Sequence, residues 1–146
     1  MATDKPKLMP FMQKLLHLPE GAQEQAYLIG SRCGHCGHVA FPPKEVCPAC
    51  LKDDDMAQIP LSRRGKIDTC TVSRVAPPGF EAPYIQAFIR LAEGPRIFSL
   101  ITGCPQEEGA VEIGQEVELV VERLCRYEKG NEMLGYKFRP LALPPA

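Results

Sequence analysis

The sequence predicts a mainly β protein with three parts: a helical arm over residues 1–24, a zinc module over 25–62, and a small barrel with a Pro-rich tail over 63–146. Two Cys-x-x-Cys pairs separated by ten residues predict the metal module. Five short segments rich in β-branched residues and broken by Gly and Pro predict the barrel. Fifteen prolines in 146 residues fit many short elements better than long helices.

The arm contains one short segment with the spacing of a helix. Its apolar side chains would line one side of that helix: Phe11, Met12, Leu15, Leu16 and Leu18. A helix of this length is only marginally stable in isolation. The segment therefore either packs on its own domain or docks on another chain.

Strands are expected on both sides of the metal site, over residues 25–31 and 56–61. The clearest barrel signal is the alternation of apolar residues over 85–91, followed by a Gly-Pro turn and a return segment over 96–102, which predicts a hairpin. The remaining barrel strands are expected over 66–75, 114–122 and 133–138.

Composition narrows the class of protein. There is no apolar run long enough to span a membrane and no secretory leader pattern at the N-terminus. Four of the seven cysteines are in Cys-x-x-Cys pairs, which favours metal binding in a reduced compartment, so we expect a cytoplasmic protein. A net charge of −1 argues against a nucleic-acid partner, which usually requires a basic face.

The metal module offers four thiolates at Cys33, Cys36, Cys47 and Cys50. In each Cys-x-x-Cys knuckle both sulfurs can reach one ion, and two knuckles complete the tetrahedral set of a structural Zn²⁺ site. Four sulfur ligands leave no position for water, so a Lewis-acid role is disfavoured. A redox dithiol and an iron–sulfur cluster are the weaker alternatives. His35 and His38 lie near the first knuckle and are interpreted as exposed loop residues, because four sulfurs already complete the coordination.

No catalytic residue is predicted. Cys70, Cys104 and Cys125 stand alone in the sequence, and an isolated cysteine in a strand is usually a small buried apolar residue. The sequence has no serine elbow, phosphate-binding loop or dinucleotide fingerprint.

A series of motifs carries a family resemblance that runs from about residue 11 to 140. The chain resembles the zinc-ribbon plus OB-fold proteins that are associated with acyl-CoA enzymes. In order, the motifs are Cys33-Gly-His-Cys-Gly37, Phe41-Pro-Pro43, Cys47-Pro-Ala-Cys50, Leu61-Ser-Arg-Arg-Gly65, Thr71-Val72, Ala92-Glu-Gly94, Ile113-Gly114 and Phe138-Arg-Pro140.

This resemblance implies a rubredoxin-like zinc ribbon and a five-stranded OB fold, with the four knuckle cysteines as metal ligands. It also implies a non-catalytic accessory subunit in a hetero-oligomer with a thiolase-fold or enoyl-CoA hydratase-like protein. The CoA thioester would then be bound mainly by the partner, near the interface. The resemblance supplies no catalytic residue and no cofactor-binding residue other than the metal ligands.

Within that family, the arm and barrel are similar to the small subunits of benzoylsuccinyl-CoA thiolases of anaerobic toluene degradation. The similarity implies a partner that performs thiolytic cleavage of a 3-oxoacyl-CoA, while this chain stabilises the partner or shapes its CoA and substrate site. Two places depart from the family pattern. Phe11-Met12 replaces a Phe-Trp pair, and Arg63 stands where many members have glycine.

Three further readings stay open from the residues. Arg63, Arg64 and Lys66 form a basic cluster that either meets a CoA phosphate or is an ordinary solvated cluster. One strand face would carry two aromatic residues and an arginine, which favours a module that binds single-stranded nucleic acid. A thiol enzyme is the third reading. The residues involved in the last two readings are Tyr84, Phe88 and Arg90, and Cys104 or Cys125.

Overall fold

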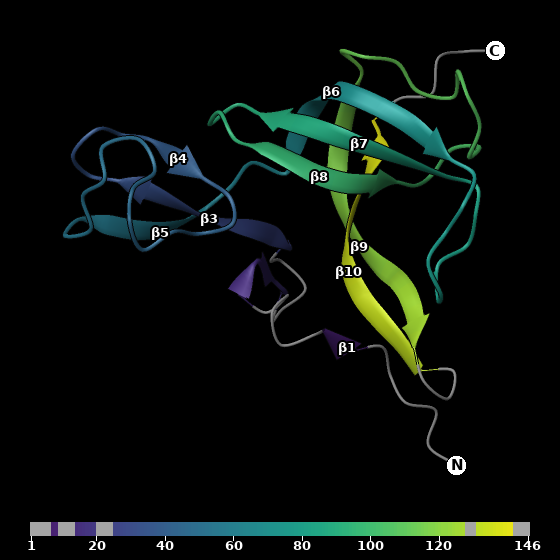
Figure 1. Cartoon of the computed structure of the whole chain (residues 1–146), viewed down its shortest axis with the longest axis horizontal. Helices are drawn as coiled ribbons and strands as arrows, with labels where there is room; N and C mark the ends of the chain where they lie inside the picture. Colours follow the sequence, from purple (N-terminus) through teal and green to yellow (C-terminus); the bar gives the residue numbers. More distant parts are fainter. Residues whose placement is uncertain (1–6, 9–13, 20–24, 128–130, 142–146) are drawn as a thin grey trace.

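The computed structural model describes residues 7–8, 14–19, 25–127 and 131–141. Within them nearly all regular structure is strand, arranged as a small ribbon of short strands beside a barrel (Figure 1). The ten strands are β1 (Lys7–Leu8), β2 (Leu16–His17), β3 (Tyr27–Cys33), β4 (Val39–Ala40), β5 (Met56–Pro60), β6 (Arg64–Ser73), β7 (Tyr84–Leu91), β8 (Arg96–Ile101), β9 (Glu116–Tyr127) and β10 (Asn131–Pro140).

The barrel is a closed sheet of five strands. Its order is β6–β7–β8–β10–β9, and β9 pairs back onto β6 through Gly65 and Val117. All neighbours are antiparallel except β8 and β10, which run parallel where Ile101 meets Phe138. This order is that of an OB fold and confirms the predicted five-stranded barrel. Closure leaves the barrel proper without free sheet edges.

Alternation along the barrel strands builds the core. In β7 the residues at every second position are 2% exposed or less, as the sequence pattern predicts: Ile85, Ala87, Ile89 and Leu91. Phe138 of β10 is the largest fully buried side chain, and Ile67, Ile97 and Leu119 complete the interior.

The zinc ribbon is organised around β3. This strand pairs antiparallel with β4 and β5 through its C-terminal half, and with β2 through Tyr27 and Leu28. The predicted strands on both sides of the metal site are confirmed as β3 and β5.

The helix predicted over residues 11–18 is wrong in its described part, while residues 11–13 lie outside the described residues. Leu16 and His17 form strand β2, and Leu16 is buried against the same core as Leu28. An apolar run of this kind suits a helix or a strand, and pairing with β3 decides between them.

The ribbon and the barrel share one hydrophobic core. Leu16, Leu28 and Leu61 belong to the same buried cluster as the barrel interior. Arg63 also joins the two parts, because its Nε donates to the carbonyl of Ala26 at 2.9 Å and its Nη2 to the carbonyl of Leu119 at 3.1 Å. The barrel and ribbon are therefore held in one orientation; the predicted domain boundaries after residues 24 and 62 stay predictions.

One feature goes beyond the sequence prediction. Strands β9 and β10 are longer than expected and continue past the barrel as a two-stranded ribbon that closes at Tyr127 and Asn131 (Figure 1). In the part of the chain that the structure describes, no helix has the length and apolar character needed to cross a membrane.

Candidate metal centre

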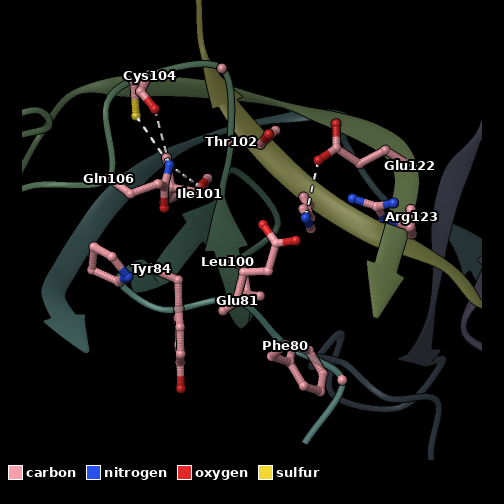
Figure 2. Close-up of a pocket in the computed structure, with 14 residues that line it drawn as sticks. Phe80, Glu81, Tyr84, Leu100, Ile101, Thr102, Cys104, Gln106, Glu122 and Arg123 are labelled. Carbon is pink, nitrogen blue, oxygen red and sulfur yellow. Dashed lines mark hydrogen bonds and ion pairs between the residues drawn. The ribbon is translucent and has the colours of Figure 1, made fainter. Parts of the chain in front are cut away.

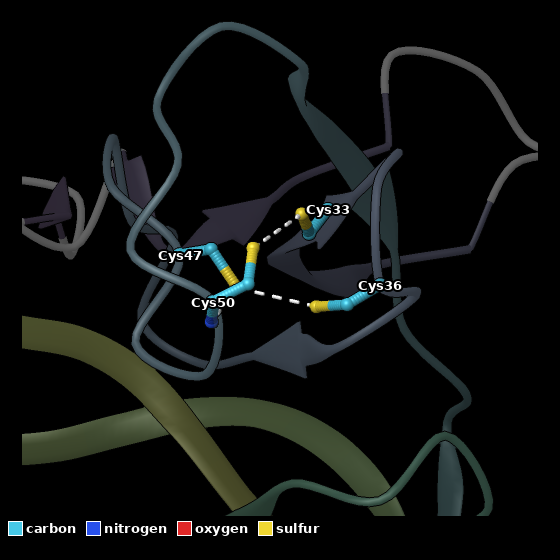
Figure 3. Close-up of side chains that lie close together, drawn as sticks. All are labelled: Cys33, Cys36, Cys47 and Cys50. Carbon is cyan, nitrogen blue, oxygen red and sulfur yellow. Dashed lines mark hydrogen bonds between the residues drawn. The ribbon is translucent and has the colours of Figure 1, made fainter.

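The four predicted cysteines come together at the tip of the ribbon (Figure 3). Cys33 ends β3, Cys36 follows in the next turn, and Cys47 and Cys50 lie in the loop between β4 and β5. The Sγ atoms of Cys33 and Cys50 are 3.6 Å apart, those of Cys36 and Cys47 are 3.5 Å apart, and all four lie within 4.8 Å of one another.

Backbone hydrogen bonds repeat in the two knuckles. The amide of the first cysteine bonds the carbonyl five residues later, in Cys33 to His38 at 3.0 Å and in Cys47 to Lys52 at 2.9 Å. The residue after the second cysteine adopts a positive φ in both, +79° at Gly37 and 67° at Leu51. Glycine adopts this conformation readily, whereas leucine is strained there.

This arrangement fits one tetrahedral ion. With Zn–S bonds near 2.3 Å, neighbouring sulfurs of a tetrahedral site are about 3.8 Å apart, close to the spacing of the four Sγ atoms. The same spacing is far beyond a disulfide bond of about 2 Å, and all four cysteines are free. A cluster of several irons would need a wider cage.

Backbone amides prepare two of the sulfurs for a metal. The amide of Cys50, 3.5 Å from the Cys47 sulfur, lowers the pKa of the Cys47 thiol to about 6, and the amide of Ala49 contributes. The amides of Cys36 and His35 likewise lower the pKa of Cys33. Because the thiolate is the metal-binding form, these amides favour coordination.

The histidines are outside the cluster. His35 Nε2 lies 2.7 Å from Asp54 Oδ1, and this contact lowers the pKa of Asp54. His38 is exposed. Among the described residues, the potential ligands that converge are the four cysteines, as the sequence predicts.

A second candidate site, around Cys104, lacks the features of a nucleophilic centre. Cys104 lines a cavity of about 530 Å³ together with Gln106, Glu122, Arg123 and Lys137 (Figure 2). Burial raises the pKa of its thiol, and no histidine lines the cavity. A thiol whose pKa is raised and that has no histidine to activate it is a poor nucleophile. Cys70 lies half-buried on β6, and the side chain of Cys125 lies outside the described residues.

The basic cluster at the start of the barrel does not converge on a cavity. The guanidinium of Arg63 bonds two backbone carbonyls, and Arg64 lies 4.0 Å from Glu118. Lys66 is exposed. Arg63 therefore joins the ribbon to the barrel in this structure, which gives a structural role to the residue that departs from the family pattern.

Two contacts between residues from different elements were not predicted from the sequence. The face of β7 that carries Phe88 and Arg90 continues onto β8 through Phe98 and Arg96. The alternation of residues 96–100 is a signal that Arg96 and Phe98 share one face of their strand, but their position opposite Arg90 and Phe88 depends on the sheet register. The carboxylate of Glu93 bonds Ser62 across 31 residues of sequence, and no local pattern announces that contact.

Comparisons with known proteins agree with this architecture. Residues 20–56 match the family model "ChsH2, rubredoxin-like zinc ribbon domain", and residues 58–122 match "ChsH2, C-terminal OB-fold domain".

Relatives span nearly the whole chain. A DUF35 domain-containing scaffold protein of Methanocaldococcus jannaschii is 44% identical over 124 residues, covering 82% of this chain and 85% of the relative. The benzoylsuccinyl-CoA thiolase subunit BbsA of Thauera aromatica is 34% identical over 137 residues, covering 94% and 92%. The solved structure "Ltp2-ChsH2(DUF35) aldolase" superposes with a TM-score of 0.63 at 29% identity, covering 80% of this chain and 86% of that chain.

Proposed function

Because this chain belongs to the family of ChsH2-type proteins in which a rubredoxin-like zinc ribbon precedes an OB fold, we propose that it is a non-catalytic accessory subunit of an acyl-CoA enzyme. The observation that carries the proposal is similarity over almost the full length of both proteins to a chain named as a thiolase subunit. The relatives named as scaffold proteins support the same role.

The site geometry supports a role outside the chemistry. Four thiolates around one ion leave no open coordination position, so the ion would act as a structural element. Cys104, which borders the cavity of about 530 Å³, has a thiol with a raised pKa and no histidine beside it in that cavity. The acid–base and nucleophilic groups of the reaction would then come from the partner.

We further propose that Cys33, Cys36, Cys47 and Cys50 hold one structural Zn²⁺. The spacing of the four sulfurs and the amides directed at Cys47 support this assignment. Zinc binding in such modules contributes on the order of 10 kcal/mol to folding, which a short ribbon with few buried side chains requires.

The finer proposal concerns the partner. We infer a thiolase-fold protein that binds the CoA thioester and cleaves a 3-oxoacyl-CoA such as benzoylsuccinyl-CoA, as in toluene degradation. This chain would stabilise that partner or border its CoA site, in a cytoplasmic hetero-oligomer. The two thiolase-subunit relatives, of Thauera aromatica and Geobacter metallireducens, support this choice over other acyl-CoA enzymes.

Co-expression with a thiolase-fold protein from the same organism tests the proposal. Light scattering after size exclusion should show one hetero-oligomer, and thiolysis of a 3-oxoacyl-CoA should require both chains. The isolated chain should show no turnover. A chain that remains separate from that protein and leaves its thiolysis rate unchanged would contradict the proposal.

A further inference from the structure

Two phenylalanines stand exposed at the centre of the outer barrel surface. Phe88 on β7 and Phe98 on β8 are opposite each other in the sheet register, and they are 39% and 48% exposed. Their ring centroids are 5.6 Å apart in an edge-to-face arrangement. Along β7 and β8 the neighbouring positions point into the barrel core, so the two phenylalanines point outward. Their exposure therefore follows from the strand alternation and not from a flexible loop.

An apolar groove adjoins this pair. It has a volume of about 300 Å³, and loop 74–83, β7, β8 and β10 supply its walls. Three polar side chains at its wall already have partners: Tyr136 donates to the carbonyl of Phe98 at 3.2 Å, Gln86 to Thr71 at 3.2 Å, and Ser99 to the carbonyl of Leu100 at 3.0 Å. The groove therefore offers mainly hydrophobic contact. Its lining residues are Pro77, Phe80, Tyr84, Gln86, Phe98, Ser99, Leu100 and Tyr136.

The other end of the phenylalanine pair is positively charged. Arg90 and Arg96 are cross-strand neighbours, and both approach the single carboxylate of Asp68, at 3.7 Å and 2.7 Å. Like charges directly opposite each other destabilise a sheet. Two guanidinium groups share one carboxylate, which leaves one positive charge for an acidic group from outside.

From these features we propose that this surface, which we call the outer aromatic face (Tyr84, Phe88, Arg90, Arg96, Phe98 and Leu100), docks the acyl-CoA enzyme subunit. The proposal rests on the proposed function, and it assigns the place and chemistry of contact. An apolar side chain of the partner fills the groove, and an acidic residue of the partner pairs with Arg90 and Arg96. Buried aromatic anchors with a charged rim are typical of protein interfaces.

The same geometry disfavours single-stranded nucleic acid at this face. Bases stack on free aromatic ring faces within a basic groove. Here the guanidinium of Arg96 lies over one face of the Phe88 ring, 4.7 Å from its centroid, and Phe98 packs against Phe88 at an interplanar angle of 66°. Asp68 neutralises one of the two arginines, and the whole chain carries a net charge of −1.

The first experiment measures affinity in the complex with the thiolase-fold protein that co-expression identifies as the partner. The double variant Phe88→Ser, Phe98→Ser should raise Kd at least tenfold, and Arg96→Glu should also weaken binding. Asp68→Asn should tighten binding a few fold, because it frees both guanidinium groups for the partner's carboxylate. Ile113→Ser, at an apolar residue that is 70% exposed elsewhere, is the matched control and should leave Kd unchanged.

Hydrogen exchange on the wild-type complex provides a reading that needs no variant. The amides of β7 and β8 and of loop 74–83 should exchange more slowly when the partner is bound. Zinc content and thermal unfolding of each variant check that it folds.

The outcomes separate the two proposals. A wild-type chain that forms no complex ends the proposed function and this inference with it. A complex that tolerates Phe88→Ser, Phe98→Ser with unchanged Kd and unprotected β7–β8 amides overturns the inference alone.

Two other occupants would also overturn it. One is a wild-type homodimer in sedimentation that the double variant abolishes. The other is micromolar binding of a fluorescent single-stranded oligonucleotide that the double variant abolishes.

Discussion

The zinc ribbon and the barrel reach a stable structure by different means. Between residues 33 and 55 of the ribbon, the buried positions are Cys33, Ala40 and Cys47, so two of the four proposed metal ligands make up most of its interior. The barrel instead buries large apolar side chains from all five strands, with Phe138 at the centre. The difference shows what the proposed coordination would replace: a segment too short to bury its own core would be held by four sulfur bonds to one ion.

Zinc removal should have the largest effect on stability, and that effect should be confined to the ribbon. Cys47→Ser, or treatment with a strong chelator, should unfold the ribbon, because the site contributes on the order of 10 kcal/mol. Zinc analysis would measure the loss of the metal, and hydrogen exchange would measure the unfolding of the ribbon. The barrel amides should stay protected while ribbon amides exchange. A variant that keeps its zinc and its intact complex but loses turnover would contradict the structural role.

The converse change removes the barrel's central side chain. Phe138→Ala should cost about 3–5 kcal/mol, because it leaves a cavity in a fully buried position. Chemical denaturation followed by tyrosine fluorescence would measure the loss. Zinc bound per chain should stay the same under native conditions. If zinc is lost in proportion to stability, the two halves are one cooperative unit and the comparison fails.

The link between the two halves should give a smaller effect. Ser62 donates to Glu93 Oε2 twice, from its amide at 2.7 Å and from its hydroxyl at 2.9 Å. Glu93→Ala should lower the unfolding free energy by about 2 kcal/mol, since both donors lose a charged acceptor. Thermal unfolding beside Glu112→Ala, an exposed control, would measure it. Glu93 Oε1 has no hydrogen-bond partner among the described residues, so Glu93→Gln should lose less than the alanine variant.

The smallest change compares the knuckles with each other. Leu51→Gly should stabilise the zinc-loaded chain by about 1 kcal/mol, because leucine is strained at positive φ and this side chain is 76% exposed. Gly37→Ala should cost a similar amount at the equivalent position, where space is open and only the conformation resists. Thermal unfolding at saturating zinc would measure both. If both variants unfold at the same temperature as the wild-type chain, then the positive φ at these two positions does not affect the stability of the knuckles.

The two kinds of region also differ in how far the sequence predicts them. Local spacing predicts that four cysteine sulfurs converge, and the structure brings them within 4.8 Å of one another, while their role as metal ligands stays a proposal. Period-two alternation predicts that Ile85, Ala87, Ile89 and Leu91 lie inside the barrel, and the structure confirms it. The short β2 strand could not be predicted, because Leu16 and His17 take their conformation from β3.

Contacts between residues that are distant in the sequence could not be predicted from it either. The Glu93–Ser62 bonds and the pairing of Phe88 with Phe98 depend on sheet register and on the joint between the two halves. The basic residues Arg63, Arg64 and Lys66 are neighbours in the sequence but do not form one cluster in the structure. Arg63 bonds the carbonyls of Ala26 and Leu119, where the ribbon meets the barrel. The sequence predicts features that depend on one strand or one knuckle. Contacts that depend on how two elements pack together can be identified only in the three-dimensional structure.

The short strand β1 has a consequence for how this protein should be handled. Lys7 and Leu8 pair in parallel with Met133 and Leu134 of β10, where that strand has left the barrel and β8 no longer accompanies it. A bare strand edge is a template on which a strand from another molecule can add. By pairing with β10, Lys7 and Leu8 cover part of this edge, and we expect this pairing to limit self-association. An N-terminal truncation or a bulky affinity tag there risks aggregation even with the zinc ribbon and barrel intact.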